Sequence, residues 1–272
     1  MIMEFNIKLR NGQILKGMIQ TPGENTKAVI ILIHGLGEHI LRYLHWAEMF
    51  KKEGIGFLGV DLPGHGLSQG RRGNIKDYSV TDEMIDILLK SCKQTFPGCP
   101  VYIYGHSLGG GILLDYLLRK KPKIKGAIVT SPWLRLSFEP PKSKVMVASV
   151  MKYLVPGLTQ PSGLKVDHIS HDKSIVEKYK NDPMVHDKIS VSLFDSAMTG
   201  AKYALAHASE LTIPTLLLHG SDDLITSPSG SHEFAEKTAM VEFKIWEGGY
   251  HELHNEPFKE DVFKYIMNWI KR

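Results

Sequence analysis

Cysteine is scarce in this chain, with only Cys92 and Cys99 among 272 residues. A small secreted domain that depends on disulfides needs more cysteines, and no spacing typical of a structural zinc site is present. We therefore expect two free thiols in a reducing compartment, the cytoplasm, and we expect neither a metal nor an organic cofactor.

Long apolar runs and concentrations of one charge are also missing. The purest apolar run, Ala28–Ile33, is far too short to cross a bilayer. The first residues, MIMEFNIKLR, include an early glutamate and lack the apolar region of a signal peptide. Lys and Arg number 33 against 29 Asp and Glu, and no basic run suits a nucleic-acid groove. A membrane-spanning segment and a nucleic-acid partner are therefore not expected.

What the chain does contain is a regular alternation of apolar segments and helical patterns. Near-continuous apolar strands separated by helices are typical of a parallel sheet covered on both faces. We expect an α/β fold with a mostly parallel, doubly wound sheet, preceded by an edge hairpin around the Asn11-Gly12 turn signal. The expected strands are Phe5–Leu9, Ile14–Gln20, Ala28–His34, Ile55–Asp61, Val101–His106, Gly126–Ser131, Ile213–Gly220 and Met240–Gly248. The expected helices are Leu41–Lys52, Asp82–Thr95, Gly110–Arg119, Ser196–Ser209, one beginning at Pro228, and Pro257–Lys271.

The alternation stops between Trp133 and about Phe194, where no convincing strand is seen and prolines are frequent. One apolar-rich helix is expected within this stretch, at Lys142–Val155. An unstructured loop of this length would be abnormal in a compact domain, so we expect an inserted unit. The predicted organisation is a core of residues 1–132 and 195–272 with a cap at residues 133–194.

The segment GHSLG, with Ser107 at its centre, follows an apolar strand and precedes a helix. A G-x-S-x-G turn in this setting holds the serine in strained backbone geometry and lifts its hydroxyl above the sheet edge. The glycines at 105 and 109 allow neighbouring chain segments to approach closely. Ser107 is therefore the predicted nucleophile.

A serine hydroxyl needs a base, and in this type of fold an acid and then a histidine follow late strands. His251 follows the last expected strand, and the Gly248-Gly249 pair before it favours it over His254 as the base. Asp222 and Asp223 both follow the preceding strand, and position alone leaves the choice between them open. His106, beside the nucleophile, is expected to pack inside the turn.

The developing oxyanion needs hydrogen-bond donors. One is expected from the backbone N–H of Leu108, directly after the nucleophile. The other is expected from the HGLGEH segment after the first parallel strand, from the backbone N–H of Leu36.

Seven segments carry a resemblance to a known family, in this order: HGLGEHILRY, DLPGHGLSQGRRG, GHSLGG, SPW, NDPMVHDKIS, LLLHGSDDLIT and EGGYHELHNE. Together they resemble the monoacylglycerol lipase and lysophospholipase group of α/β-hydrolases, in its bacterial type. The resemblance implies the α/β-hydrolase fold, a cap that acts as a lid, and Asp223 as the acid, the fourth residue of G-x-x-D.

The resemblance also implies a polar end of the pocket that holds glycerol, at Glu38, Arg42 and His254, and a cap tyrosine near the pocket mouth at Tyr179. From the residues alone, Glu38 and Arg42 are equally well an ordinary ion pair at i, i+4 spacing on a helix. Both interpretations remain open.

A lipid substrate requires apolar side chains, because burial of each CH₂ contributes about 0.8 kcal/mol. Met146, Val150 and Met151 in the cap are candidates for contact with an acyl chain, and the alternative is that they form the core of the cap. The same helix could contact a membrane surface transiently.

These features predict a serine carboxylic-ester hydrolase that cleaves a monoacylglycerol or a lysophospholipid through an acyl-enzyme on Ser107. One alternative is an esterase or thioesterase with short or non-lipid acyl substrates. Another is a ligand-binding protein without turnover on the same scaffold.

Overall fold

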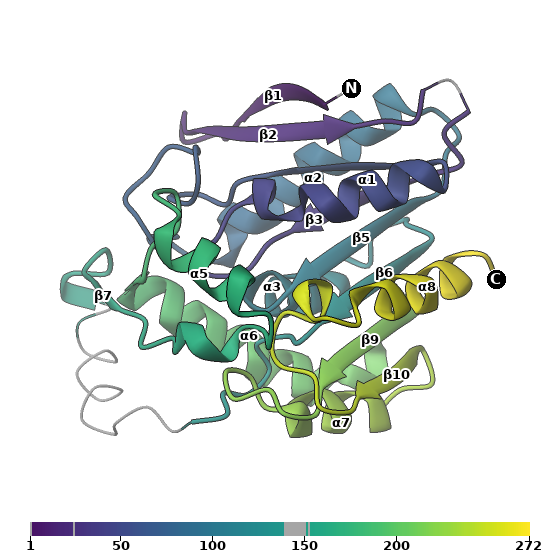
Figure 1. The fold of residues 1–272 in the computed structure, drawn as a ribbon. Coiled ribbons are helices and arrows are strands. Elements are labelled where there is room, and N and C mark those ends of the chain that lie inside the picture. The colour runs from purple at the N-terminus through teal and green to yellow at the C-terminus, as the bar shows by residue number, and fades with distance from the viewer. Residues whose placement is uncertain (1, 24, 139–150, 152) are drawn as a thin grey trace.

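In the computed structural model, residues 2–23, 25–138, 151 and 153–272 are described, and they form an eight-stranded sheet between two layers of helices (Figure 1). The strand order is β1-β2-β4-β3-β5-β6-β9-β10. Strands β1 and β2 pair antiparallel, β2 is antiparallel to β4, and all other pairs are parallel. The strands are β1 Ile2–Lys8, β2 Ile14–Gln20, β3 Ala28–Ile33, β4 Ile55–Val60, β5 Val101–His106, β6 Gly126–Thr130, β9 Thr215–Gly220 and β10 Val241–Trp246.

The helices cover both faces of this sheet, which confirms the predicted doubly wound fold. Alternate residues of β3 show why: Val29, Ile31 and Ile33 belong to one core cluster, and Ala28, Ile30 and Leu32 to the other. The helices of the first face are α2 Tyr78–Thr95, α3 Leu108–Lys120, α6 Val191–His207 and α7 Pro228–Glu236. Those of the second face are α1 Leu44–Lys52, preceded by a 3₁₀ turn at Ile40–Tyr43, and α8 Lys259–Ile270.

Two helices begin several residues earlier than predicted. Helix α2 starts at Tyr78 because the Asp77 carboxylate accepts a hydrogen bond from the Ser79 backbone N–H. Helix α6 starts at Val191 because the Ser190 hydroxyl accepts one from the Leu193 N–H.

The stretch expected to lack strands contains two short ones. Strand β7 (Thr159–Pro161) pairs antiparallel with β8 (Lys188–Ser190), so the expectation of no strand between residues 133 and 194 is wrong. Helix α5 (Lys173–Asn181) and a 3₁₀ turn at Val166–His168 lie between them. The predicted helix at Lys142–Val155 lies mainly outside the described residues, and so do Met146 and Val150. The division into core and cap stays a prediction.

Described residues of the predicted cap contact two loops at the carboxyl ends of the parallel strands. The His186 backbone N–H donates to the Gly37 carbonyl, and the Glu252 N–H donates to the Ile169 carbonyl. These bonds join the described part of the cap to two loops of the sheet. Among the described residues, no helix combines the length and the apolar character needed to cross a membrane.

Candidate active site

Strand β5 and helix α3 are joined by a single residue, Ser107. Its φ of 55° and ψ of −118° are strained for a residue with a side chain. The turn is compact because a Cβ on Gly109 would lie 2.1 Å from the Ile33 carbonyl oxygen, and one on Gly105 would lie 2.6 Å from the Gly109 carbonyl oxygen. Only glycine allows the helix to approach the sheet this closely.

Three predicted side chains from three loops meet at this turn. The Ser107 Oγ lies 2.8 Å from the His251 Nε2, and the His251 Nδ1 lies 2.7 Å from the Asp223 Oδ2. Ser107 follows β5, Asp223 follows β9 and His251 follows β10. All three side chains are buried. The loops meet because the carboxyl ends of parallel strands share one edge of a sheet.

The geometry distinguishes the two aspartates. The Asp223 Oδ1 accepts hydrogen bonds from the backbone N–H groups of Ile225 and Thr226, and its Oδ2 lies 3.0 Å from the His219 Nε2. Asp222 is exposed, and its carboxylate accepts a bond from the neighbouring Ser221 hydroxyl. Asp223 is therefore the carboxylate that contacts the histidine.

The charges of Asp223 and His251 shift each other's pKa. Burial alone would raise the pKa of Asp223, but the charge of His251 and hydrogen bonds from His219 and His251 lower it. Burial alone would lower the pKa of His251, but the carboxylates of Asp223, Glu252 and Glu38 raise it above its ordinary value. The imidazolium of His251 is thus stabilised in place, which a base that receives a proton requires.

The loop Gly35–Glu38, here called the glycine loop, passes beside Ser107. A Cβ on Gly35 would lie 3.2 Å from the Ser107 Cβ. The Glu38 Oε1 accepts the Gly35 backbone N–H at 2.6 Å and so fixes the loop. Within the described residues, the backbone N–H groups of Leu36 and Leu108 have no hydrogen-bond partner. Neither donor is engaged elsewhere among these residues, which the predicted role in an oxyanion hole requires.

Arg42 connects Glu38 to a second carboxylate that the sequence did not reveal, Glu252. The guanidinium Nη1 lies 2.6 Å from both the Glu38 Oε2 and the Glu252 Oε1, and Nη2 lies 2.7 Å from the Glu252 Oε2. The guanidinium also lies 4.6 Å from the ring centroid of Tyr179. Glu38 and Arg42, which the sequence offered as an ordinary i, i+4 ion pair, are thus part of a buried cluster that also contains Glu252 and Tyr179. The one signal for Glu252 was its position directly after His251.

The two carboxylates differ in their pKa. Burial raises the pKa of Glu38, Arg42 opposes this rise, and Glu252 adds to it. Burial would also raise the pKa of Glu252, but the charge of Arg42 and its hydrogen bonds lower it. Glu252 therefore remains the ionised partner of Arg42.

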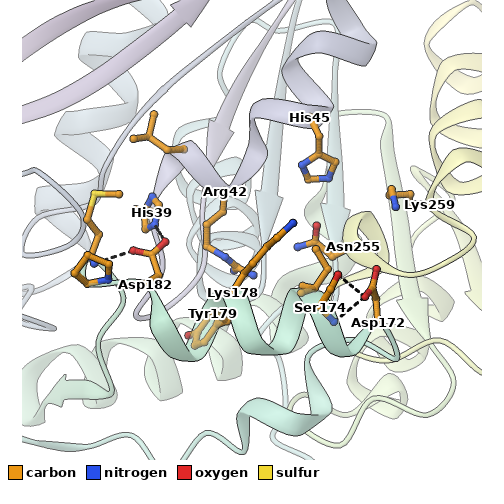
Figure 2. A pocket seen from close by; sticks show the side chains of 14 residues that line it. His39, Arg42, His45, Asp172, Ser174, Lys178, Tyr179, Asp182, Asn255 and Lys259 are labelled. Atoms are coloured by element: carbon orange, nitrogen blue, oxygen red, sulfur yellow. Dashed lines mark hydrogen bonds and ion pairs between the residues drawn. The ribbon is translucent and has the colours of Figure 1, made fainter.

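Two cavities adjoin this group. The cavity next to Ser107 has about 20 Å³ and is lined by Leu36, Glu38, Glu252, Tyr179, Leu164 and Ile225, among others. A wider outer cavity of about 740 Å³ is lined by Arg42 and Tyr179, with Lys178, His45 and Lys259 also at its wall (Figure 2). Tyr179 lines both cavities, and Arg42 lines the outer cavity while it donates to Glu38 and Glu252 of the inner one.

Two other predicted contacts, His254 and Met151, do not line the inner cavity. His254 is fully buried, with its ring 4.5 Å from that of Tyr43 and 4.8 Å from that of His106. His106 packs inside the turn, with its Nδ1 3.0 Å from the Thr130 hydroxyl. Met151 is half-buried and does not line either cavity.

Comparison with known proteins gives this geometry its context. Residues 24–258 match a family described as serine aminopeptidase, S33. The chain is 32% identical to a monoacylglycerol lipase of Mycolicibacterium smegmatis, over 93% of this chain and 91% of the relative. The chain belongs to this serine hydrolase family. Its resemblance to the monoacylglycerol lipase group is confirmed, and the chain is an enzyme of the esterase and lipase class.

Further relatives agree with this assignment. A phospholipase of Bacillus subtilis is 30% identical over 87% of this chain and 92% of the relative. An abhydrolase domain-containing protein of Dictyostelium discoideum is 37% identical over 92% of this chain, which spans 27% of that longer protein. The crystal structure of a Paleococcus ferrophilus monoacylglycerol lipase superposes with a TM-score of 0.86 at 32% identity, covering 94% and 97% of the two chains. The α/β-hydrolase fold of the chain is thereby established.

Proposed function

We propose that this hydrolase cleaves single-chain lipid esters, either monoacylglycerols or lysophospholipids, through an acyl-enzyme on Ser107. The observation that carries the proposal is the continuous hydrogen-bonded series from Ser107 through His251 to Asp223. Its relatives named as a monoacylglycerol lipase and a phospholipase support a lipid ester as the substrate.

The first half of the reaction acylates the serine. The Ser107 Oγ forms a bond to the ester carbonyl carbon while its proton moves to the His251 Nε2. The N–H groups of Leu36 and Leu108 stabilise the oxyanion, and each such donor contributes about 2.7–4 kcal/mol to transition-state stabilisation. The tetrahedral intermediate then loses its alcohol, which takes the proton from His251.

The second half returns the enzyme to its starting state. A water molecule loses a proton to the His251 Nε2 as its oxygen attacks the acyl carbon. The bond to Ser107 then breaks, and the serine oxygen regains the proton from His251 while the fatty acid departs. Asp223 holds the imidazole in the required tautomer through both halves.

At the alcohol end of the substrate we propose contacts with Glu38 and Tyr179, with Arg42 and the fully buried His254 behind them. At the acyl end we propose Met146, Val150 and Met151. Tyr179 is supported by its place on the wall of the cavity next to Ser107.

We further propose a cytoplasmic enzyme that contacts membranes transiently through the cap. The support for this contact is a group of exposed apolar side chains in the described part of the cap. Tyr153 is 79% exposed and Leu154 is 71% exposed.

A substrate series tests the function. Monoacylglycerols, lysophospholipids and p-nitrophenyl esters of increasing chain length are offered to the wild type and to Ser107→Ala. Hydrolysis of the lipid esters that disappears with Ser107→Ala supports the proposal. Activity confined to acetyl esters would favour the short-chain esterase, and no Ser107-dependent turnover would favour a ligand-binding protein.

A further inference from the structure

The charged side chains around Arg42 are arranged asymmetrically. Glu38 and Glu252 line the cavity next to Ser107, and no Lys or Arg among the described residues lines it with them. Arg42 lines the outer cavity instead, together with Lys178 and Lys259 (Figure 2). Of the described residues, the cavity next to Ser107 is thus lined by carboxylates without a Lys or Arg, whereas the outer cavity carries both signs of charge, with Asp172 and Asp182 beside its cations.

The wall of the cavity next to Ser107 has an excess of negative charge once Glu38 is ionised, because Glu252 is already the ionised partner of Arg42. One guanidinium, that of Arg42, serves two carboxylates, while Asp223 is matched by His251 when the histidine is protonated. The remaining hydrogen-bond donors to Glu38 and Glu252 are neutral: the Tyr43 hydroxyl, the Gly35 N–H and the Asn255 amide. Glu38 and Glu252 are only 2% and 3% exposed, so water does not screen their charge effectively.

The leaving alcohol must lie close to this wall. It receives its proton from the His251 Nε2, and His251, Ser107 and Glu252 line the same cavity. An alcohol that carries a phosphate would bring a like charge toward two buried carboxylates, whereas an uncharged polyol would not. The hydroxyl groups of such a polyol can donate hydrogen bonds to carboxylate oxygens.

We propose that Glu252 is a specificity-determining residue that excludes esters with an anionic leaving alcohol and selects those with an uncharged one. The inference rests on the proposed hydrolysis of lipid esters and assigns the class of alcohol. Glu252 sets the net charge of the wall beside the leaving alcohol. The single positive charge of Arg42 is paired with two carboxylates, and Glu252 is the second of them.

The experiment compares two esters with the same acyl chain in neutral detergent micelles: a 1-monoacylglycerol and the corresponding 1-acylglycerol 3-phosphate. The quantity measured is the ratio of their kcat/KM values on one enzyme preparation, which does not depend on the fraction of active protein. The variants are Glu252→Gln, which removes the charge, and Glu252→Asp, which keeps it. Glu236→Gln is the control, because it removes an exposed carboxylate on helix α7.

The wild type is expected to prefer the monoacylglycerol by more than about tenfold, and Glu252→Gln to reduce this preference about tenfold. Glu252→Asp and Glu236→Gln are expected to keep it. A merely structural role for Glu252 would lower both kcat/KM values and leave their ratio unchanged. An unchanged ratio in Glu252→Gln, or equal cleavage of both esters by the wild type, would overturn the inference while the lipase function stands. Cleavage of neither ester would instead refute the proposed function, and with it the inference.

Discussion

At the scale of single residues, the environment of Asp223 separates it from its neighbour Asp222. Asp223 is buried against two histidines, and Asp222 is exposed in a turn. We expect Asp223→Asn to lower kcat by about 10³–10⁴-fold, because the amide disfavours the required imidazole tautomer. Asp222→Asn is the matched control and should stay within about twofold of the wild type, since surface changes have small effects. Steady-state hydrolysis of a neutral ester measures both, and the reverse order of effects would contradict the assignment.

The pKa of His251 predicts a pH dependence. The histidine accepts a proton from Ser107 only when it is neutral, so activity falls as the pH drops through its pKa. Because neighbouring carboxylates raise this pKa, the acid limb of kcat/KM should have its midpoint above about 6.5, the ordinary histidine value. Glu252→Gln removes one of the charges that raise the pKa, so it should move the midpoint to lower pH. A midpoint below the ordinary value in the wild type would contradict the proposed charge arrangement.

Residue types and spacing predicted Ser107 and His251, because each follows a recognisable apolar strand. They left Asp222 and Asp223 open as the acid, and only the family resemblance favoured Asp223. They did not predict Glu252. Its partner Arg42 is 210 positions away in the chain, and no local pattern joins them. A contact of this kind depends on tertiary packing, which a single sequence does not display.

At the scale of elements, the turn between β5 and α3 depends on close approach to β3. A Cβ on Gly109 would lie 2.1 Å from the Ile33 carbonyl oxygen, and backbone atoms cannot move aside cheaply. We expect Gly109→Ala to destabilise the protein by about 1–3 kcal/mol and to reduce activity strongly, because the turn that positions Ser107 must shift. Urea unfolding and ester hydrolysis test this.

Gly157→Ala provides the control for that substitution. Its Cβ would meet nothing closer than 3.7 Å, so the change should leave stability within about 0.5 kcal/mol of the wild type. Equal effects of the two substitutions would show that the close approach at Gly109 is unimportant.

The core strands were predictable because they are apolar on both faces, and their bounds shift by only one or two residues. The early starts of α2 and α6 were missed because the capping side chains of Asp77 and Ser190 precede the periodic apolar pattern. Strands β7 and β8 were missed for another reason. Three-residue strands carry no periodicity, and they exist only through their pairing with each other.

At the scale of the whole molecule, Arg42 links three distant segments: the glycine loop through Glu38, the loop after β10 through Glu252, and helix α5 through Tyr179. Arg42→Ala would leave two buried carboxylates without their cation. We expect a loss of about 3–5 kcal/mol in the free energy of unfolding, measured by urea titration near neutral pH.

An exposed ion pair gives the comparison for Arg42. The Arg135 side chain is 50% exposed and pairs with Glu233, so Arg135→Ala should cost less than about 1 kcal/mol. A loss as small as this for Arg42→Ala would mean that the buried group does not hold the three segments together.

The order of strands, helices and inserted segment along the chain was predictable. The alternation of apolar strands with helices is visible in the sequence, and so is its interruption after Trp133. The position of the cap against the glycine loop was not, since it depends on backbone contacts such as that from His186 to Gly37. These contacts hold His186 and its neighbours against the glycine loop beside Ser107.

The central claim is that Ser107 is the nucleophile activated by His251. Incubation with a fluorophosphonate, followed by intact mass measurement and peptide mapping, tests it most directly. We predict one adduct per chain on the peptide that contains Ser107, no adduct in Ser107→Ala, and labelling of His251→Ala slowed by at least about 10³-fold. Labelling at another residue, or at an undiminished rate in His251→Ala, would contradict the account.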